Sequence, residues 1–283
     1  MSAFPVDAIL PDLAASLAAN RTAVLQAPPG TGKTTRVAPF LLDAAWLKGR
    51  KILLLEPRRL AARTAAAFMA RQRSERVGET IGYHIRLERR AGPRTRIELL
   101  TEGLLTQRLL HDPELSDTGL VIFDEFHERS LAVDTALALA LDTRRALRPD
   151  LRLVVMSATL RPEAIAAHLG DADIHTADTR LYPVETRLLD RLSTASIPQQ
   201  AAGAVLRALR EETGSVLLFL PGEGEIRRTL DLLRNADLPP EVSLYPLYGA
   251  LSREEQDAAV APPAVGRRKV VLATSIAETS LTI

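Results

Sequence analysis

Five short apolar segments, separated by helical patterns, constrain the fold of this chain more than any other feature. The segments are residues 22–27, 51–56, 96–101, 120–125 and 151–157. They are apolar throughout rather than alternating, which is typical of strands buried on both faces. Apolar residues recur at helical spacing in 4–19, 33–45, 59–72, 102–111 and 131–146. This alternation predicts an α/β fold with a mainly parallel sheet covered by helices on both faces.

A second series of strand and helix patterns follows a polar segment at 171–184. Its predicted strands are 184–189, 215–220, 242–247 and 269–274, and its predicted helices are 198–212, 223–235 and 252–260. The similar rhythm predicts two α/β domains, residues 1–178 and 179–283, with 171–184 as the linker. The second domain is shorter and its pattern stops soon after a strand, so we expect a truncated domain.

Composition excludes several other classes of protein. The chain is 46% hydrophobic and 25% charged, as in soluble globular proteins. It has no cysteine, which excludes a disulfide scaffold and a thiolate metal site. No apolar run approaches the ~18 residues of a membrane span, and the N-terminus lacks the pattern of a signal peptide. A soluble, cytoplasmic protein without membrane association is expected.

Residues 25–35, LQAPPGTGKTT, form the strongest local motif. They follow a predicted strand and open a predicted helix, which is the context of a phosphate-binding loop. Glycines allow the backbone amides to point at phosphate oxygens, Lys33 can reach the β- and γ-phosphates, and the Thr34 hydroxyl can bind Mg²⁺. Ala27 replaces the first glycine of the general pattern. The predicted nucleotide-binding residues are Pro29, Gly30, Thr31, Gly32, Lys33, Thr34 and Thr35.

The segment GLVIFDEFHERS, residues 119–130, places charged residues directly after a predicted buried strand. Ligands of parallel α/β sheets bind at the carboxyl ends of strands. Asp124 is therefore predicted to hold Mg²⁺ together with Thr34, and Glu125 to orient or deprotonate an attacking water. An ordinary strand end that meets solvent is the alternative. It does not explain why two adjacent carboxylates occur in a chain that already has a phosphate-binding motif.

Seven segments occur in the order found in superfamily 2 helicases. They are APPGTGKTT, EPRRLAAR, TEGLL, DEFHERS, SATL, FLPGEGEI and VVLATSIAETSLTI. From residue 22 onward the chain resembles the DEAH/RHA group, and most of all bacterial HrpB-type ATP-dependent helicases. The resemblance implies two RecA-like P-loop NTPase domains with ATP and Mg²⁺ in the cleft between them. It also implies single-stranded nucleic acid as partner, with RNA favoured over DNA.

The resemblance also assigns roles to residues outside the two main motifs. His127 is expected among the catalytic residues, as a contact between the nucleotide site and the second domain. Ser157 and Thr159 of SAT are expected to couple hydrolysis to strand movement. The residues expected near the nucleic-acid backbone are Arg58, Thr101, Gly222 and Thr274.

Five arginines occur within residues 86–96, RLERRAGPRTR. Such a cluster is either an electrostatic contact for nucleic acid or an exposed, solvated loop. The sequence favours neither interpretation.

The function predicted for the parent protein is NTP-driven movement along, or unwinding of, RNA or DNA. The chain lacks the family's later arginine-rich segment, and an arginine of that kind contributes roughly 10³–10⁵ in rate. We therefore expect the chain to bind nucleotide, to hydrolyse it poorly and not to unwind. A nucleotide-dependent clamp or switch without unwinding is the alternative. A P-loop kinase is disfavoured because the SAT and LATSIAETS segments would then have no role.

Overall fold

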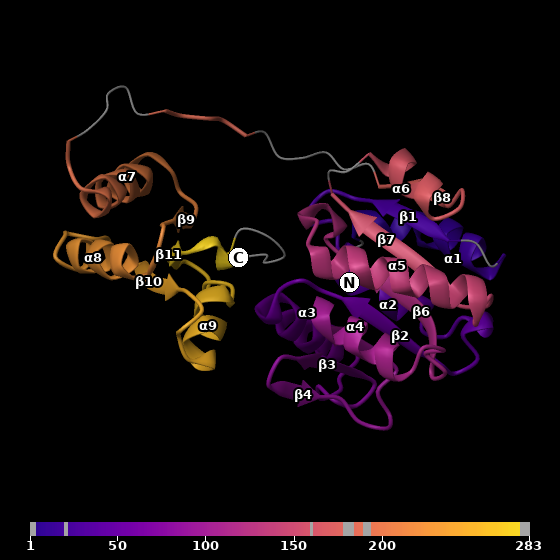
Figure 1. The fold of residues 1–283 in the computed structure, drawn as a ribbon. Helices are drawn as coiled ribbons and strands as arrows, with labels where there is room; N and C mark the ends of the chain where they lie inside the picture. Colours follow the sequence, from indigo (N-terminus) through magenta and orange to yellow (C-terminus); the bar gives the residue numbers. More distant parts are fainter. Residues whose placement is uncertain (1–3, 20–21, 159–160, 178–183, 189–193, 278–283) are drawn as a thin grey trace. The chain divides into compact units, whose positions relative to one another are not determined.

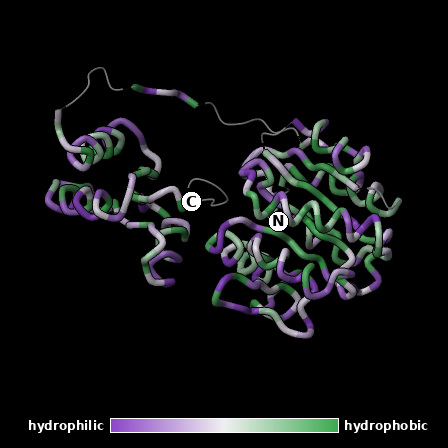
Figure 2. The backbone as a smooth tube through the Cα atoms, in the orientation of Figure 1, coloured by the Kyte–Doolittle hydropathy of each residue, from purple (hydrophilic) through white to green (hydrophobic). Residues whose placement is uncertain are grey.

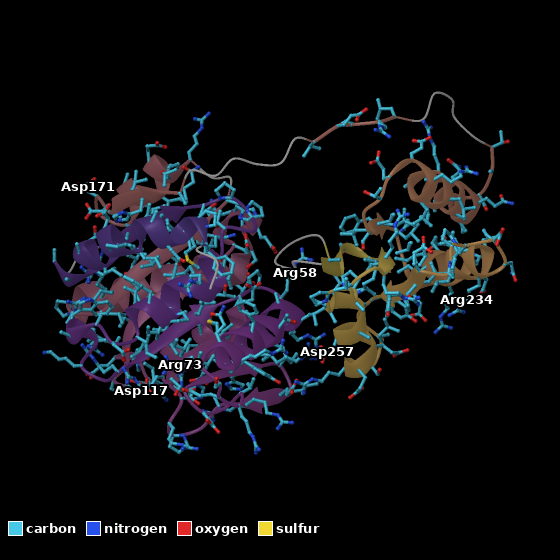
Figure 3. The ribbon with its side chains drawn as sticks, turned by 180° about the vertical axis from the view of Figure 1, so that it is seen from behind. Arg58, Arg73, Asp117, Asp171, Arg234 and Asp257 are labelled. Carbon is cyan, nitrogen blue, oxygen red and sulfur yellow. The ribbon has the colours of Figure 1, made fainter. Side chains whose placement is uncertain are left out.

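The computed structural model divides the chain into two compact units, Met1–Leu181 and Tyr182–Ile283 (Figure 1). The structure describes residues 4–19, 22–158, 161–177, 184–188 and 194–277. Charged side chains project from the outer surfaces of both units, as Asp171 and Arg234 illustrate (Figure 3). Among the described helices, none is long and apolar enough to cross a membrane.

Unit 1 is built on an eight-stranded sheet with the order β4-β3-β5-β2-β6-β7-β1-β8. Its strands are β1 (Ala23–Gln26), β2 (Lys51–Leu55), β3 (Ile81–Ile85), β4 (Glu88–Arg90), β5 (Ile97–Leu100), β6 (Thr118–Phe123), β7 (Arg152–Ser157) and β8 (Asp173–Thr176). Neighbouring strands are parallel except for the antiparallel pair β3–β4. The predicted α/β class with a mainly parallel sheet is confirmed.

Helices cover both faces of this sheet (Figure 1). They are η1 (Pro5–Ile9), α1 (Leu10–Ala18), α2 (Lys33–Leu41), η2 (Ala45–Leu47), α3 (Arg59–Gln72), α4 (Glu102–His111), η3 (Phe126–Glu128), α5 (Leu131–Ala146) and α6 (Pro162–His168). The strand residue Leu54 packs in the core with α1, α2 and α3, whereas Leu53 and Leu55 pack in the core with α4, α5 and α6. Both faces of each central strand are thus buried, which explains their continuous hydrophobic character (Figure 2).

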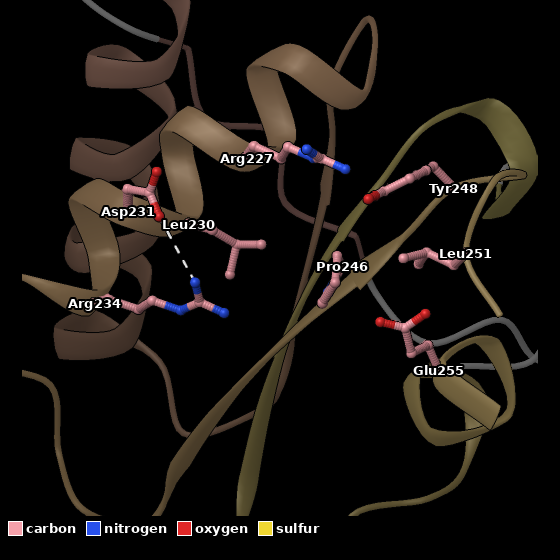
Figure 4. A pocket seen from close by; sticks show the side chains of 8 residues that line it. All are labelled: Arg227, Leu230, Asp231, Arg234, Pro246, Tyr248, Leu251 and Glu255. Carbon is pink, nitrogen blue, oxygen red and sulfur yellow. Dashed lines mark ion pairs between the residues drawn. The ribbon is translucent and has the colours of Figure 1, made fainter.

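Unit 2 contains a three-stranded parallel sheet with the order β10-β11-β9. Its elements are α7 (Ile197–Glu211), β9 (Val216–Phe219), α8 (Glu223–Arg234), β10 (Val242–Leu247), α9 (Arg253–Val260), β11 (Arg268–Ala273) and η4 (Ser275–Ala277). In its core, α7 and α8 pack with alternate residues of β11, Val270 and Leu272. A cavity of about 270 Å³ lies among α8, β10, the loop that follows β10 and the first turn of α9 (Figure 4). None of the predicted site residues lines this cavity.

The structure corrects the prediction at the junction of the two series. Residues 171–184 were expected to be a linker, but β8 lies within them and pairs in parallel with β1. An edge strand has one partner and tolerates polar side chains, so its sequence lacks the continuous apolar run of the central strands. Residues 184–188 form no strand, contrary to the prediction, and their side chains are exposed; residue 189 lies outside the described part.

The structure differs from the prediction in two further places. The helix predicted to reach residue 45 ends at Leu41, and Pro39 lies in its last turn, where its ring removes a backbone donor. Strands β3 and β4 were not predicted as strands. Gly82 of β3 lies where a Cβ atom would come within 2.3 Å of the Arg90 carbonyl oxygen, so the close approach of β3 to β4 requires glycine.

Candidate functional site

Three adjacent strands of unit 1 bring the main predicted residues to one edge of the sheet. In the order β6-β7-β1, each strand is followed or ended by a predicted segment. Strand β1 leads into the 27–32 loop, β6 leads into Asp124 and Glu125, and β7 ends at Ser157. Gln26 is in register with Ser157, whose carbonyl accepts a hydrogen bond of 3.0 Å from the Ala27 amide. Thr159 lies outside the described residues.

The loop between β1 and α2 has the backbone geometry of an anion site. Gly30 and Gly32 have φ values of 77° and 87°, in the left-handed region that glycine adopts without strain. The Thr31 hydroxyl donates to the Pro28 carbonyl at 2.8 Å and closes the loop on itself. Gly32 is the N-cap of α2. The first amides of a helix have no intrahelical acceptor, so the loop ends where a phosphate is favoured.

Lys33 is the buried cation of this site, with 4% of its surface exposed. Its Nζ donates to Glu125 Oε1 at 2.8 Å. Burial alone lowers the pKa of Lys33, but the charges of Asp124 and Glu125 outweigh burial, and the pKa is raised above its ordinary value. The ammonium is therefore charged although it is almost fully removed from solvent.

Asp124 is 1% exposed and makes two close contacts. The Thr34 hydroxyl donates to its Oδ2 at 2.5 Å, and the Glu125 amide donates to its Oδ1 at 2.8 Å. Burial raises the pKa of Asp124 to about 6, in spite of the opposing effect of Lys33. Two carboxyl groups thus share one buried cation, so the site has an excess of negative charge.

The pair formed by Thr34 and Asp124 fits a magnesium ion. Mg²⁺ prefers oxygen ligands, keeps several waters and is usually held by one or two carboxylates together with substrate phosphates. A hydroxyl and a carboxylate oxygen lie 2.5 Å apart here. The described residues contain no group of three or more histidine, cysteine, aspartate or glutamate side chains arranged for a metal.

Glu125 adopts a left-handed conformation with φ of 47°. This conformation costs a non-glycine residue roughly 1–3 kcal/mol and persists only where surrounding contacts maintain it. His127 follows in η3, and its Nδ1 lies 3.3 Å from Glu125 Oε2 without the geometry of a hydrogen bond. The imidazole is thus beside the carboxylate predicted to orient water. Its contact with the second domain stays a prediction.

Sequence reasoning missed Glu56, a third carboxyl group at this edge of the sheet. Glu56 directly follows β2 and is fully buried. Strand β2 pairs with β6, and the Asp124 amide donates to the Leu55 carbonyl at 3.0 Å. The charge of Glu56 also favours the protonated form of Lys33. The available signal was an acidic residue at the end of the apolar run KILLLE.

The residues expected near nucleic acid lie at starts of helices and ends of strands. Arg58, Thr101 and Gly222 are the N-caps of α3, α4 and α8. Thr274 follows β11, and its amide donates to the Leu247 carbonyl at 3.1 Å. The structure therefore places Arg58 and Thr101 in unit 1 and the other two in unit 2. Arg58 is one of the labelled side chains of Figure 3.

The arginine segment 86–96 forms part of a hairpin rather than a plain loop. Strands β3 and β4 pair antiparallel, and Leu87 at their turn is 95% exposed. Arg96 is held by backbone carbonyls, with its Nη2 donating at 3.0 Å to that of Leu42. Arg89 lies 3.8 Å from the buried Glu98. Some of the arginines therefore stabilise unit 1, while the turn of the hairpin faces solvent.

Comparisons with known proteins identify relatives. Residues 10–167, more than half of the chain, match the family described as DEAD/DEAH box helicase. The chain is 48% identical over 283 residues to the ATP-dependent RNA helicase HrpB of Escherichia coli, covering 100% of this chain and 35% of that protein. It is 34% identical over 263 residues to the ATP-dependent RNA helicase HrpA of Borreliella burgdorferi, covering 92% and 32%. The chain thus spans about a third of the length of these relatives.

Solved structures give the same result. The crystal structure of the Escherichia coli DEAH/RHA helicase HrpB matches with a TM-score of 0.91 and 48% identity, over 99% of this chain and 36% of that one. The crystal structure of the E. coli DExH-box NTPase HrpB matches with a TM-score of 0.81 and 48% identity, over 100% and 35%.

Proposed function

Because this chain belongs to the DEAD/DEAH box helicase family, we propose that it is the core of an ATP-dependent helicase that couples NTP hydrolysis to movement along or unwinding of RNA. The observation that supports this most is a hydrogen-bonded cluster in which Lys33 and Thr34, at the start of α2, contact Asp124 and Glu125, which follow β6. The names of the HrpB and HrpA relatives support RNA rather than DNA. The two units support a division into RecA-like domains near 1–178 and 179–283.

The first step of the proposed mechanism is an exchange of partners at Lys33. Its ammonium is paired with Glu125 in this structure. The phosphates of a nucleotide in the 27–32 loop have more negative charge than one carboxylate and would attract the ammonium away from it. Glu125 would then be free to orient the attacking water and accept its proton. Thr34 and Asp124 would hold Mg²⁺, which when bound offsets the charge of the phosphates.

The proposed contacts with nucleic acid are of a kind that does not distinguish sequence. Arg58, Thr101 and Gly222 each cap a helix, so amides of that helix point toward a phosphate placed at its start. Contacts to phosphates position a strand without selecting bases. We also propose Arg86, in the exposed turn between β3 and β4, as an electrostatic contact with nucleic acid.

The test is steady-state ATP hydrolysis by the chain, with and without single-stranded RNA, beside Glu125→Gln. Glu163→Gln in α6 is the matched control, since it removes an exposed carboxylate of the same unit. We expect ATP binding in all three proteins and a Glu125-dependent rate in the parent and the control only. A Glu125→Gln variant that hydrolyses ATP as fast as the parent would contradict the proposed site.

For the 283-residue chain by itself we propose slow hydrolysis and no unwinding. The reason is the absence of the arginine-rich segment from these residues, since such an arginine contributes roughly 10³–10⁵ in rate in P-loop enzymes. Rapid, Glu125-dependent turnover would contradict this second proposal while leaving the nucleotide site in place. Displacement of a duplex strand by the chain would contradict the absence of unwinding.

A further inference from the structure

Ser130 connects the acidic segment to a helix that the proposed hydrolysis mechanism does not use. Its hydroxyl donates to Glu102 Oε2 at 2.5 Å. The same oxygen accepts a hydrogen bond of 3.0 Å from the Val133 amide, so Ser130 is also the N-cap of α5. Glu102 is the first residue of α4, directly after its N-cap Thr101. One hydroxyl thus joins the end of the 124–130 segment to the start of α4.

The segment between Glu125 and Ser130 is held by its backbone conformation and by its packing. Glu125 and Arg129, on either side of η3, have positive φ values of 47° and 49°. Between them Phe126 is 4% exposed and packs in the core beneath α4 and α5. Arg129 lies over the Phe126 ring and pairs with Asp134 at 2.9 Å. Close-packed protein interiors have low compressibility and transmit strain, so we expect a displacement of Glu125 to reach Ser130.

A second contact joins the same segment to the start of another helix. Glu128 Oε1 lies 3.5 Å from Nε of Arg58, the N-cap of α3. Two helix starts that we propose as nucleic-acid contacts are therefore touched by the residues that follow Glu125. The Ser130–Glu102 contact is much shorter than the Arg58–Glu128 contact. Hydrogen bonds from a hydroxyl to a carboxylate are strong at about 2.5–2.7 Å, and the Ser130–Glu102 contact has such a length.

We propose that the Ser130–Glu102 hydrogen bond is a positioning contact that couples nucleotide binding at Lys33 and Glu125 to nucleic-acid binding at the start of α4. This inference rests on the proposed function. Loss of the Lys33–Glu125 ion pair on nucleotide binding changes the position of the 125–130 segment, and Ser130 passes that change to Glu102. The Glu102 carboxylate lies in the first turn of α4, where it competes with a phosphate for the positive end of the helix. Ser130 therefore controls whether the start of α4 is available to an RNA phosphate.

The test measures how much a non-hydrolysable ATP analogue with Mg²⁺ changes the affinity of the chain for a fluorescent single-stranded RNA. The variants are Glu102→Ala, Ser130→Asp, their double variant, and Ser130→Thr. Ser130→Asp keeps an N-cap for α5 but replaces the donor to Glu102 with a repelling carboxylate. Ser130→Thr keeps both contacts. Thr135→Ala, which removes an exposed hydroxyl of α5, is the matched control.

In the parent we expect the analogue to change RNA affinity by about 5-fold or more, and RNA to change analogue affinity by the same factor. In Glu102→Ala and Ser130→Asp the factor falls to less than about 2, while analogue affinity without RNA stays within about 2-fold of the parent. The double variant shows no further loss, because both changes remove the same contact. Ser130→Thr and Thr135→Ala retain the coupling of the parent.

The possible failures are distinguishable. Coupling in Glu102→Ala and Ser130→Asp that equals that of the parent overturns the inference. So does a parent that binds analogue and RNA independently, and in that case the nucleotide site still stands. A parent that binds no analogue overturns the proposed function, and the inference with it. A parent that binds analogue but no RNA overturns the proposed RNA contacts and, with them, the role of α4.

Discussion

Two lysines in the described part of the chain are almost fully buried, and their surroundings differ in kind. Lys33 of unit 1 and Lys269 of unit 2 are 4% and 5% exposed. The Lys33 ammonium faces carboxylates, and its pKa is raised because they outweigh the effect of burial. The Lys269 ammonium donates to the carbonyls of Ala258, Ala259 and Ala261 at the end of α9, at 3.0, 2.5 and 2.6 Å. Burial lowers its pKa, and no carboxylate among the residues that the structure describes opposes that effect.

The difference separates a structural site from a site that can exchange ligands. An ammonium has three donors, and three helix carbonyls satisfy all of them at Lys269. Those carbonyls belong to the last turn of α9 and its C-cap Ala261, so they are fixed by the backbone. At Lys33 the partner is a side chain, Glu125, in a cluster with more negative than positive groups. A phosphate can replace that partner without breaking a helix, so the same residue type stabilises one unit and binds a ligand in the other.

The largest expected effect tests the ligand-binding half of this comparison. Lys33→Met should lower kcat/KM for ATP by about 10²–10³-fold, because it removes the charge that is proposed to leave Glu125 for the phosphates. The unfolding of unit 2 should be unchanged. Steady-state ATPase assays and urea unfolding measure the two quantities. Lys48→Met is the matched control, since Lys48 is an exposed lysine of the same unit. An unchanged ATPase rate in Lys33→Met would refute the role of this lysine.

The next effect tests the structural half. Lys269→Met should destabilise unit 2 by about 2–4 kcal/mol, because buried carbonyls at the end of α9 lose a charged donor. Nucleotide affinity should stay within about 2-fold of the parent, since Lys269 lies outside unit 1. Urea unfolding followed by circular dichroism reports both units, while fluorescence of Trp46, the only tryptophan, reports unit 1. A shift of the Trp46 transition as large as the dichroism shift would remove the distinction between the two lysines.

A smaller effect concerns the support of the phosphate loop from the N-terminal side. Asp7 pairs with Arg36 of α2 at 2.8 Å, and the Val6 amide donates to the Thr31 carbonyl at 3.3 Å. Asp7→Asn should raise the KM for ATP by about 2- to 5-fold and leave kcat unchanged, as expected for an ion pair contributing up to ~1 kcal/mol. Asp12→Asn, on the exposed side of α1, is the control. A lower kcat at unchanged KM would place Asp7 in the chemical step instead.

The sequence predicted those parts of the site that follow from strand and loop patterns. Continuous apolar runs located β1, β6 and β7, and the residues after them came together because parallel strands end at one edge. The bounds of α3, α4 and α5 agree with the predicted 59–72, 102–111 and 131–146. In these cases one local pattern is sufficient, since buried strands and amphipathic helices impose their own periodicity.

What the sequence did not predict depends on contacts between distant segments. Nothing in the local sequence of Ser130 or Glu102 indicates that the two side chains meet. Lys269 follows two arginines, GRRK, and resembles an exposed basic stretch, although α9 buries it. Strand β8 was missed because an edge strand keeps polar residues. Tertiary packing decides each of these cases, and a periodicity argument does not include it.

The smallest expected effect is that the contributions of Lys33 and Lys269 to stability change in opposite directions as the pH rises into the alkaline range. The pKa of Lys33 is raised by folding, so its contribution to stability is present below the unfolded value of 10.5 and is lost as pH rises through the folded value. The pKa of Lys269 is lowered, so its contribution is present above 10.5 and is lost as pH falls through the folded value. Raising the pH from about 9 to about 11 should therefore weaken unit 1 through Lys33 and favour unit 2 through Lys269.

Each lysine variant removes the pH-dependent contribution of one lysine. The measurement is therefore the difference in unfolding free energy between parent and variant across this pH range. The difference for Lys33→Met should change in one direction with rising pH and that for Lys269→Met in the other. Titrations of groups distant from the substituted lysine are shared by parent and variant and cancel in each difference. If both differences changed in the same direction, the carboxylates would not dominate the surroundings of Lys33. Burial would then determine the pKa of Lys33, as it does that of Lys269, and an exchange of Glu125 for phosphate would lose its electrostatic basis.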